Sequence, residues 1–373
     1  MQEGVVMKIG IITLSASDNC GSLLQTYALK KALEKYGDVE VINFSSKESH
    51  AMYDVPHYWG IKRLLNNKKI KLLTKGSNDY ASFRHDFIGI SGKEYLIEDL
   101  RDISDYYDVV VTGSDQVWNV QMQDFSEAFF LGWSNSKKVA YAPSLGGTHL
   151  KHSSNFATIK QWLEDFSFLS VREDIGRKCL EEVTRHEVQK VLDPTLILDE
   201  AEWNRIVEEP LIQGDYIFYY SWAYCEDSIS QIVADTSKRL GIPVYVIDPR
   251  KWISRDPRKW NFKLYESTGP YVFLNLMKYA KRCYVESFHG MVFAYIFRKN
   301  YWLLDIHENI EELDTRLMEF VKLLGAQDRI LTKFNVFTVD QDEAVEYGNN
   351  EILMGLRAES WKYLDLAFGE VES

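Results

Sequence analysis

The pattern that decides the fold is "KIGIITLSASDNCGSLLQTYALKKALEKYGDVEVINF" (8–44), which contains signals for a strand, a helix and a second strand. The run "KIGIITL" (8–14) is short and apolar, as buried strands are. Apolar residues at helical spacing follow within 22–37, where Gly37 is placed to end a helix, and "VEVINF" (39–44) resumes a strand. A strand, a helix and a strand in this order predict a parallel sheet with a right-handed crossover.

Strand and helix signals continue to alternate along the chain. The first half holds further strand candidates at 107–113, 138–144, 166–173 and 188–195, and helix candidates at 151–165 and 174–183. Residues 196–214 are rich in acidic residues and lack strand character, so we place a hinge there. A second alternating series begins with "YIFYYSW" (216–222). We therefore predict an α/β fold with two Rossmann-like, doubly wound domains that face a central cleft.

The length of 373 residues fits two domains better than one or three. We expect an N-terminal α/β domain over 1–198 and a C-terminal α/β domain over 199–345. A C-terminal helix within 346–373 is expected to pack back on the N-terminal domain.

Charge and cysteine content limit the class of protein. The formal net charge of −12 argues against a nucleic-acid partner, because nucleic-acid binding depends on a basic surface. The cysteines are far apart and form no CxxC pair, which implies a reducing compartment. The start "MQEGVVMKIG" lacks the features of a signal peptide, and no run approaches the ~18 apolar residues of a membrane span. We therefore expect a cytoplasmic protein.

One basic cluster, "IKRLLNNKKIKLL" (61–73), has apolar residues interleaved at helical spacing. We favour an amphipathic helix with a solvated basic face. The alternative is contact with a membrane surface or acidic lipid-linked material, which would place the protein peripherally at the inner face of the plasma membrane.

Polar residues follow the predicted strands, at the ends where ligands of such sheets bind. Asn19, Cys20 and Gly21 form a turn that leads into a helix, where free N–H groups could hold an anion or Asn19 could cap them. The stretch "GSDQVWN" (113–119) has the density of hydrogen-bonding groups expected of a polyol site, although Asp115 alone would be interpreted as a helix cap.

Two further strand ends carry titratable groups. Arg172 needs an anionic partner, which Glu173, Asp193 or a ligand carboxylate or phosphate could supply. After "RCYV" (282–285) comes "ESFHG", which places His289 in the first turn of a helix, next to a glycine that would let the backbone approach a ligand. A lone histidine is usually structural, but its place at a strand end favours function.

The chain resembles the polysaccharide pyruvyl transferase family. The similar stretches occur in order from about residue 8 to about residue 332: "NCGSLLQTYALKKAL", "VVVTGSDQVWN", "KVAYAPSLG", "FLSVRE", "VLDPTLILDEAEW", "GPYVFLNLM", "ESFHGMVFAYIF" and "DTRLMEFVKLLGAQDRIL". The resemblance implies a GT-B-like pair of domains and transfer from phosphoenolpyruvate to a sugar, which leaves a pyruvate ketal on two hydroxyls and releases phosphate.

The resemblance also implies partners and a pathway. The acceptor would be a sugar or a lipid-linked oligosaccharide in capsular, exopolysaccharide or cell-wall glycan synthesis, with peripheral contact to membrane-bound glycan-assembly machinery. Phosphoenolpyruvate would be the co-substrate, and neither a metal nor a nucleotide cofactor is implied.

The family's active-site positions correspond to Asp115, Arg172 and His289. From the chemistry of these groups, we expect His289 to donate a proton, Asp115 to act as a base or orient a hydroxyl, and Arg172 to bind phosphate or carboxylate. Trp118 would offer a sugar platform. The remaining candidates for substrate binding, most of which could instead serve as caps or turns, are Asn19, Gly21, Gln25, Ser114, Gln116, Asn119, Ser287 and Gly290. These assignments put the acceptor on the N-terminal domain and the donor on the C-terminal domain.

Two positions depart from the family pattern. Cys20 stands where many members have Tyr, and Ser287 stands where one branch has Arg. The donor-binding role of that Arg would pass to Arg172, to backbone amides, or to another cation such as Arg298, Lys299 or Arg316.

Two other classes of function remain open. One is a GT-B-type glycosyltransferase that uses a nucleotide-sugar donor, since fold does not fix function. The other is a non-catalytic sugar-binding relative, for which the absent Arg at 287 is the support.

Overall fold

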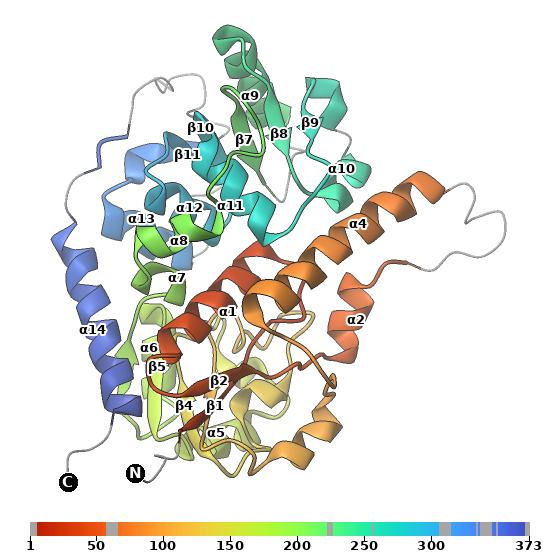
Figure 1. Ribbon diagram of the computed structural model, residues 1–373. Helices are drawn as coiled ribbons and strands as arrows, with labels where there is room; N and C mark the ends of the chain where they lie inside the picture. The colour runs from red at the N-terminus through yellow and green to blue at the C-terminus, as the bar shows by residue number, and fades with distance from the viewer. Residues whose placement is uncertain are drawn as a thin grey trace, which may run out of the picture. The chain divides into compact units, whose positions relative to one another are not determined.

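The computed structural model describes residues 6–56, 66–221, 227–255, 257–305, 315–332, 335, 345–347 and 350–369. The chain forms two compact units, each built on a six-stranded parallel sheet with flanking helices (Figure 1). The first unit comprises Met1–Asp54, Arg84–Leu198 and Glu351–Ser373, and the second comprises Val55–Phe83 and Asp199–Asn350. The prediction of two doubly wound α/β domains is confirmed.

The sheet of the first unit has the strand order β2-β1-β3-β4-β5-β6, and every neighbouring pair is parallel. Its strands are β1 (Lys8–Ile12), β2 (Asp38–Val41), β3 (Val109–Thr112), β4 (Lys137–Ala140), β5 (Phe168–Val171) and β6 (Val188–Lys190). Its helices are α1 (Cys20–Leu33), α2 (Lys47–Tyr53), α5 (Phe156–Glu164), α6 (Asp174–Glu181), α7 (Pro194–Ile197) and α14 (Glu351–Phe368). Shorter helical turns are η1 (Arg84–Ile88), η2 (Ile97–Ile103), η3 (Glu127–Phe130) and η4 (Leu150–His152).

Alternate residues of these strands face opposite sides of the sheet. Val110 and Ala140 belong to one hydrophobic cluster together with Ile159 of α5 and Leu180 of α6. Burial of such side chains contributes about 25 cal/mol for each Å² of apolar surface removed from water. This cluster fixes the strand ends on which the polar residues stand.

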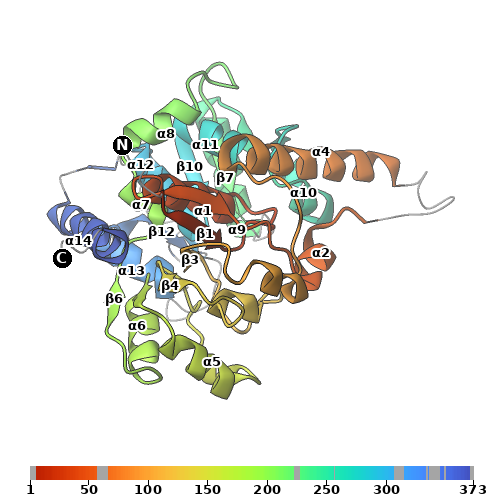
Figure 2. The same cartoon turned by 60° about the horizontal axis from the view of Figure 1, so that its bottom comes forward.

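Helix α14 covers the other face of the same sheet. The Tyr363 hydroxyl donates to the carbonyl oxygen of Ala140 at 2.8 Å, and the Leu192 N–H donates to the Ser360 hydroxyl at 2.9 Å. Both views show α14 alongside this sheet (Figures 1 and 2). The end of the chain therefore belongs to the unit in which the chain starts.

The second unit has the strand order β12-β11-β10-β7-β8-β9, again parallel throughout. Its strands are β7 (Ile217–Tyr220), β8 (Val244–Val246), β9 (Lys263–Leu264), β10 (Arg282–Val285), β11 (Tyr301–Asp305) and β12 (Ile330–Thr332). Its helices and turns are α4 (Asn67–Phe83), α8 (Glu200–Ile206), α9 (Asp227–Leu240), α10 (Pro249–Arg255), η5 (Pro257–Trp260), α11 (Pro270–Tyr279), α12 (Phe288–Ile296), α13 (Thr315–Leu324) and η7 (Gln327–Arg329).

Helix α4 corrects the expected domain boundaries. We expected residues 55–83 in the N-terminal domain, but the described part of this segment, 55–56 and 66–83, belongs to the second unit. The Asp79 carboxylate accepts a hydrogen bond from the Thr268 N–H at 2.9 Å, and a Cβ at Gly76 would lie 2.9 Å from Cγ2 of Thr268. Glycine thus lets α4 approach the segment before α11, a long-range contact that the local sequence does not indicate.

The predicted amphipathic helix at 61–73 falls partly outside the described residues, which resume at 66. The described part belongs to α4, whose buried residues are Leu73, Gly76 and Phe83. Among the residues that the structure describes, no helix combines the length and apolar character needed to cross a membrane.

Candidate functional site

The strand order of the first unit places its polar residues at one point. The chain leaves β1 for β2 on one side and later returns to β3 on the other side. Ligands of doubly wound sheets bind beyond the carboxyl ends of the two strands where this reversal occurs. Thr13 follows β1, and Ser114 and Asp115 follow β3.

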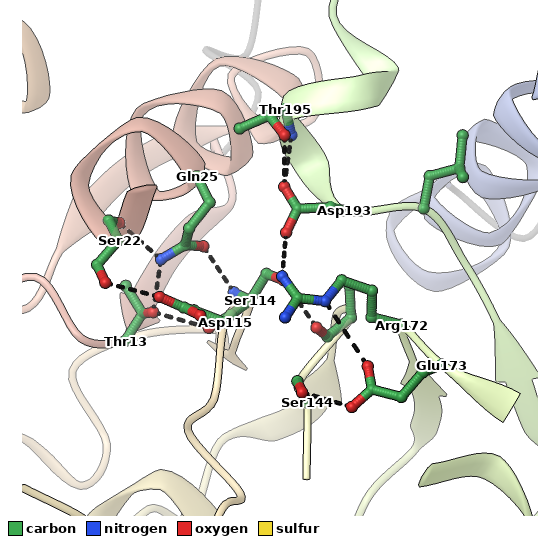
Figure 3. A network of polar contacts seen from close by, with 12 residues as sticks. Thr13, Ser22, Gln25, Ser114, Asp115, Ser144, Arg172, Glu173, Asp193 and Thr195 are labelled. Carbon is green, nitrogen blue, oxygen red and sulfur yellow. Dashed lines mark hydrogen bonds and ion pairs between the residues drawn. The ribbon is translucent and has the colours of Figure 1, made fainter. Parts of the chain in front are cut away.

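The side-chain amide of Gln25 connects these two strand ends (Figure 3). Its Nε2 donates to the Thr13 hydroxyl at 3.0 Å, and its Oε1 accepts from the Ser114 N–H at 3.0 Å. The Thr13 hydroxyl donates to the Ser114 carbonyl at 3.0 Å, and the Ser114 hydroxyl donates to Ala142 O at 2.7 Å. Gln25 and Ser114 are fully buried. Both were candidates for substrate binding, but their hydrogen bonds match the alternative of a structural role.

Asp115 is held by Ser22 of α1. The Ser22 hydroxyl donates to Asp115 Oδ2 at 2.6 Å. Asp115 has φ 68°, in the left-handed region that Asp tolerates better than most residues. The preceding Gly113 has φ 111°, and a Cβ there would lie 2.2 Å from Tyr141 O, so only glycine fits. These constraints fix a carboxylate at the switch point of the sheet, with a residue exposure of 7%.

The turn before α1 is capped by its own side chain. Asn19 Oδ1 accepts hydrogen bonds from the N–H groups of Gly21 at 2.9 Å and Ser22 at 3.4 Å. This is the capping alternative for Asn19 and Gly21, and it occupies two of the N–H groups that we considered for an anion. Cys20 is 1% exposed, so a cysteine in place of the tyrosine found in many family members changes the packing at this turn.

Trp118 does not offer a sugar platform in this structure, which corrects that expectation. Its side chain is fully buried, and its ring stacks on Phe130 with 5.3 Å between ring centroids. Its Nε1 donates to Phe129 O at 3.1 Å. Two neighbouring candidates are joined to each other, since Asn119 Nδ2 donates to Gln116 Oε1 at 2.8 Å. The aromatic ring therefore anchors the loop that carries Asp115.

Arg172 lies in a buried ion-pair network at the ends of β4, β5 and β6 (Figure 3). Its Nη1 lies 2.5 Å from Asp193 Oδ2, and its Nε lies 3.6 Å from Glu173 Oε2. Asp193 Oδ1 also accepts from the Thr195 N–H at 3.0 Å and caps α7. The Ser144 hydroxyl donates to Glu173 Oε1. Both partners that we considered for Arg172 are thus present within the protein.

The charge balance of this network is acidic. Burial alone would lower the pKa of Arg172, but the carboxylates of Asp193, Glu173 and Asp115 together raise it above its usual value. Arg172 therefore stays a cation, and three carboxyl groups lie close enough to stabilise its charge.

The second unit has its own switch point between β7 and β10, where His289 is found. Ser287 caps α12, since its hydroxyl accepts from the Gly290 N–H at 3.0 Å. A Cβ at Gly290 would lie 3.0 Å from Val285 Cβ, so the glycine is required where α12 packs on β10. His289 is the second residue of α12 and is 8% exposed. At the neighbouring strand end, the Ser221 hydroxyl donates to Glu286 Oε2 at 2.5 Å.

The cations that we considered as replacements for the absent Arg at 287 lie at different places. Arg298 and Lys299 follow the carboxyl end of α12, about 13 Å along the helix from His289. Lys299 Nζ donates to Lys278 O at 2.8 Å. Arg316 instead lies one turn before Phe320 on α13, and the Phe320 ring is 5.6 Å from that of Phe288. Phe320 also lies 6.3 Å from the Tyr295 ring near the end of α12, so Arg316 is on the face of α13 that packs along α12.

A comparison with known protein families matches the part of the chain that contains the motifs of both units. The sequence model of the family "Polysaccharide pyruvyl transferase" matches residues 19–307, which is more than half of the chain. The chain belongs to the polysaccharide pyruvyl transferase family. The resemblance noted in the sequence is confirmed, and the family is a family of transferases. No curated protein matches the chain significantly.

Solved structures show the same fold at low sequence identity. A UDP-N-acetylglucosamine 2-epimerase structure matches with a TM-score of 0.53 and 9% identity, over 99% of this chain and 97% of that chain. The Staphylococcus aureus MnaA–UDP co-structure matches with a TM-score of 0.51 and 13% identity, over 96% of this chain and 97% of that chain. A putative UDP-N-acetylglucosamine 2-epimerase of Listeria monocytogenes has a TM-score of 0.51 and 9% identity, over 97% and 91% of the respective chains. This pyruvyl transferase family member therefore has a GT-B-like fold.

Sequence reasoning missed part of the site in this family member. Ser22 binds Asp115 across a separation of 93 residues, which no local pattern indicates. Asp124 was also missed; it is 1% exposed, and the Tyr53 hydroxyl donates to its Oδ2 at 3.4 Å. Burial raises the pKa of Asp124, and the charge of Asp115 adds to the effect. The only signal in the sequence was that Asp124 follows "GSDQVWN" closely.

We predict that Arg172→Met lowers the free energy of unfolding by about 3–5 kcal/mol, because Asp193 and Glu173 would lose the partner that compensates their burial. Chemical denaturation measures the change. Arg177→Met is the matched control, since Arg177 pairs with the exposed Glu181 and its loss should cost at most about 1 kcal/mol. Unchanged stability of Arg172→Met with loss of phosphoenolpyruvate binding would instead make Arg172 a ligand-binding residue.

Proposed function

We propose that this protein transfers a pyruvyl group from phosphoenolpyruvate to two hydroxyls of a sugar and forms a pyruvate ketal. Membership of the polysaccharide pyruvyl transferase family supports this reaction class. The observation that carries the proposal is the carboxylate of Asp115, fixed by Ser22 at the switch point of the first sheet. A fixed carboxylate at that point is suited to accept a proton from, or orient, a sugar hydroxyl.

The charge of the first unit supports its assignment to the acceptor. Asp115, Glu173 and Asp193 all act on the single guanidinium of Arg172. Phosphoenolpyruvate carries a phosphate and a carboxylate, and repulsion would oppose its binding beside this acidic network. A neutral sugar has no such penalty. We therefore propose Arg172 as a positioning residue that holds the strand ends, not as a clamp for the donor.

The proposed reaction combines three proton transfers with the loss of phosphate. A proton is added to the methylene carbon of the enol phosphate, and a sugar hydroxyl attacks the adjacent carbon as its own proton passes to a base. Phosphate then leaves with the electrons of the C–O bond, and a second hydroxyl closes the ketal and loses its proton to the departing phosphate. We assign the first proton to His289 and the hydroxyl proton to Asp115, because imidazole and carboxylate groups suit these roles.

A second candidate is transfer from a nucleotide-sugar donor. The carboxylate of Glu286 follows β10 and accepts a hydrogen bond from Ser221 at the switch point of the second sheet. A carboxylate at a strand end is the type of group that binds ribose hydroxyls in doubly wound folds. Glu286 is therefore the residue that favours the nucleotide-sugar alternative.

The deciding experiment measures phosphate release from phosphoenolpyruvate against a panel of galactosides, glucosides and N-acetylhexosaminides, followed by mass analysis for the added ketal. Ketal formation supports the proposal. Protection from thermal unfolding by uridine diphosphate but not by phosphoenolpyruvate would favour the nucleotide-sugar alternative. Sugar binding without turnover of either donor would indicate a non-catalytic relative.

We predict that His289→Gln lowers kcat by roughly 10²–10⁴, the usual effect of losing a general acid or base, and leaves donor binding nearly intact. The melting temperature should stay within the range of the control His85→Gln, whose ring is exposed and contacts Asp86. A structural histidine would give the opposite pair of results, a lower melting temperature with normal turnover per folded molecule. Both quantities are measured on the same preparation.

We predict that Arg316→Ala weakens phosphoenolpyruvate binding by about 10-fold or more, because a hydrogen bond to a charged group contributes about 1.5–3 kcal/mol. Titration calorimetry measures the dissociation constant. Arg298→Ala is the matched control, since Arg298 follows the opposite end of α12. Equal effects of the two substitutions would remove Arg316 from the proposed donor site.

A further inference from the structure

The first unit contains a cavity of about 560 Å³ that none of the expected site residues line. Cavities of this size fall within the range that binds small organic ligands. The walls come from the residues that follow β2, from the start of η2, and from the loop that follows "GSDQVWN". The cavity thus begins at the carboxyl end of β2, the neighbour of β1, where ligands of such sheets are found.

The lining combines hydroxyls with a few apolar side chains. Ser45, Ser126, Ser153 and Ser154 contribute hydroxyl groups, and Phe125 contributes an aromatic surface. Ser45 is 4% exposed, and no side-chain hydrogen bond of Ser45 is found within the described ranges. A buried hydroxyl at a cavity wall is available to a ligand. Hydroxyl groups beside an aromatic ring are suited to a sugar, which presents both hydroxyls and an apolar face.

The charge of the lining selects against anions. Among the described lining residues, three carry carboxylates, Glu48, Glu98 and Glu127, and two carry basic groups, His152 and Lys47, with Lys47 3.9 Å from Glu98. Glu127 accepts a hydrogen bond from Asn155 at 2.5 Å. Phosphate or an acidic glycan would be repelled by this surplus of carboxylates. Neutral sugars would use the same carboxylates as acceptors for their hydroxyl protons.

Helix α2 and the loop that follows Asp115 both contribute to the cavity wall. Its first residue, Lys47, lines the cavity, and its last residue is Tyr53. The Tyr53 hydroxyl donates to Asp124, and burial together with the charges of Asp124, Asp115 and Asp18 raises the pKa of Tyr53. Val120 and Phe125, which also line the cavity, belong to the loop that follows Asp115, and Phe125 comes directly after Asp124. The loop that carries Asp115 therefore continues into the cavity wall.

We propose that this cavity, which we call the Ser45 cavity, binds neutral sugar residues of the acceptor glycan that adjoin the sugar whose hydroxyls react at Asp115. The proposal rests on the proposed function, since it assigns the cavity to the acceptor of that reaction. It implies that the protein prefers an oligosaccharide to a single sugar.

The test measures binding without phosphoenolpyruvate, by saturation-transfer NMR and calorimetry. The probes are methyl β-galactoside, N-acetylglucosamine, chitotetraose and a β-linked galactotetraose, with a hyaluronan tetrasaccharide as the acidic comparison. We expect a neutral tetrasaccharide to bind at least 10-fold more tightly than its monosaccharide and the acidic one to bind more weakly. Absence of binding by both neutral tetrasaccharides, or equal affinity for monosaccharide and tetrasaccharide, overturns the proposal.

Variants locate the binding. Ser154 is exposed at the cavity, so Ser154→Trp should fill the cavity without loss of folding and weaken tetrasaccharide binding at least 10-fold. Glu98→Gln preserves the shape of the side chain but removes its charge, and it should weaken tetrasaccharide binding several-fold. Ser167→Trp, at an exposed serine of the same unit outside the cavity, is the matched control. Unchanged affinity in both cavity variants overturns the proposal, as does equal loss in the control.

Turnover separates this inference from the proposed function. Ketal could form on monosaccharides and oligosaccharides with equal KM, and Ser154→Trp could leave that KM unchanged. This result would support the proposed reaction and contradict the proposed binding of sugar in the Ser45 cavity. The protein could instead form no ketal but bind a tetrasaccharide, and Ser154→Trp could abolish that binding. This result would support sugar binding in the Ser45 cavity and contradict the proposed reaction.

Discussion

The site of the first unit depends on the hydrogen bonds of one buried amide. Gln25 can donate and accept at once, so it satisfies the hydroxyl of Thr13 at one strand end and the N–H of Ser114 at the other. Without the amide oxygen, that buried N–H would lose its partner, at a cost of about 1–3 kcal/mol. All of α1 except Lys30 and Lys31 is buried, which leaves Gln25 no alternative position. Ser22, one turn earlier on the same helix, then determines where Asp115 lies.

At the neighbouring strand ends, buried charged groups satisfy one another as the Gln25 amide does at the first two. Arg172, Asp193 and Glu173 follow β5 and β6, and each is 6% exposed or less. Burying charged groups is unfavourable unless they are paired and hydrogen-bonded, and Ser144 and Thr195 supply additional hydrogen bonds to the two carboxylates. A large part of the polar character that the sequence places at the strand ends therefore serves to connect strands. Residues of the motifs near an active site need not all touch the substrate.

The sequence predicts the fold well because its evidence is local. Strand and helix periods, together with polar residues after each strand, are visible within single segments. Side-chain depth and long-range packing are not visible in this way. Trp118 becomes a core residue only through Phe130 and its neighbours, and nothing in the sequence of α4 indicates that this helix packs beside Thr268. Proximity in sequence also misleads, since Arg298 is close to His289 in number but a whole helix separates them. Site residues that depend on distant partners, such as Ser22 with Asp115, required the structure.

The charges of the first unit limit the kind of ligand that this unit can bind. Transfer from an enol phosphate to a sugar requires a carboxylate near the hydroxyls and cations near the donor. Within a single site, the carboxylate would repel the donor and the cations would make the carboxylate a weaker base. In the first unit, carboxylates outnumber the guanidinium at the strand ends, and they also dominate the Ser45 cavity. Both features favour a neutral ligand and disfavour an anion. The second sheet also has a carboxylate at its switch point, Glu286, so the proposed anionic donor would need a cation beside His289 to offset that charge.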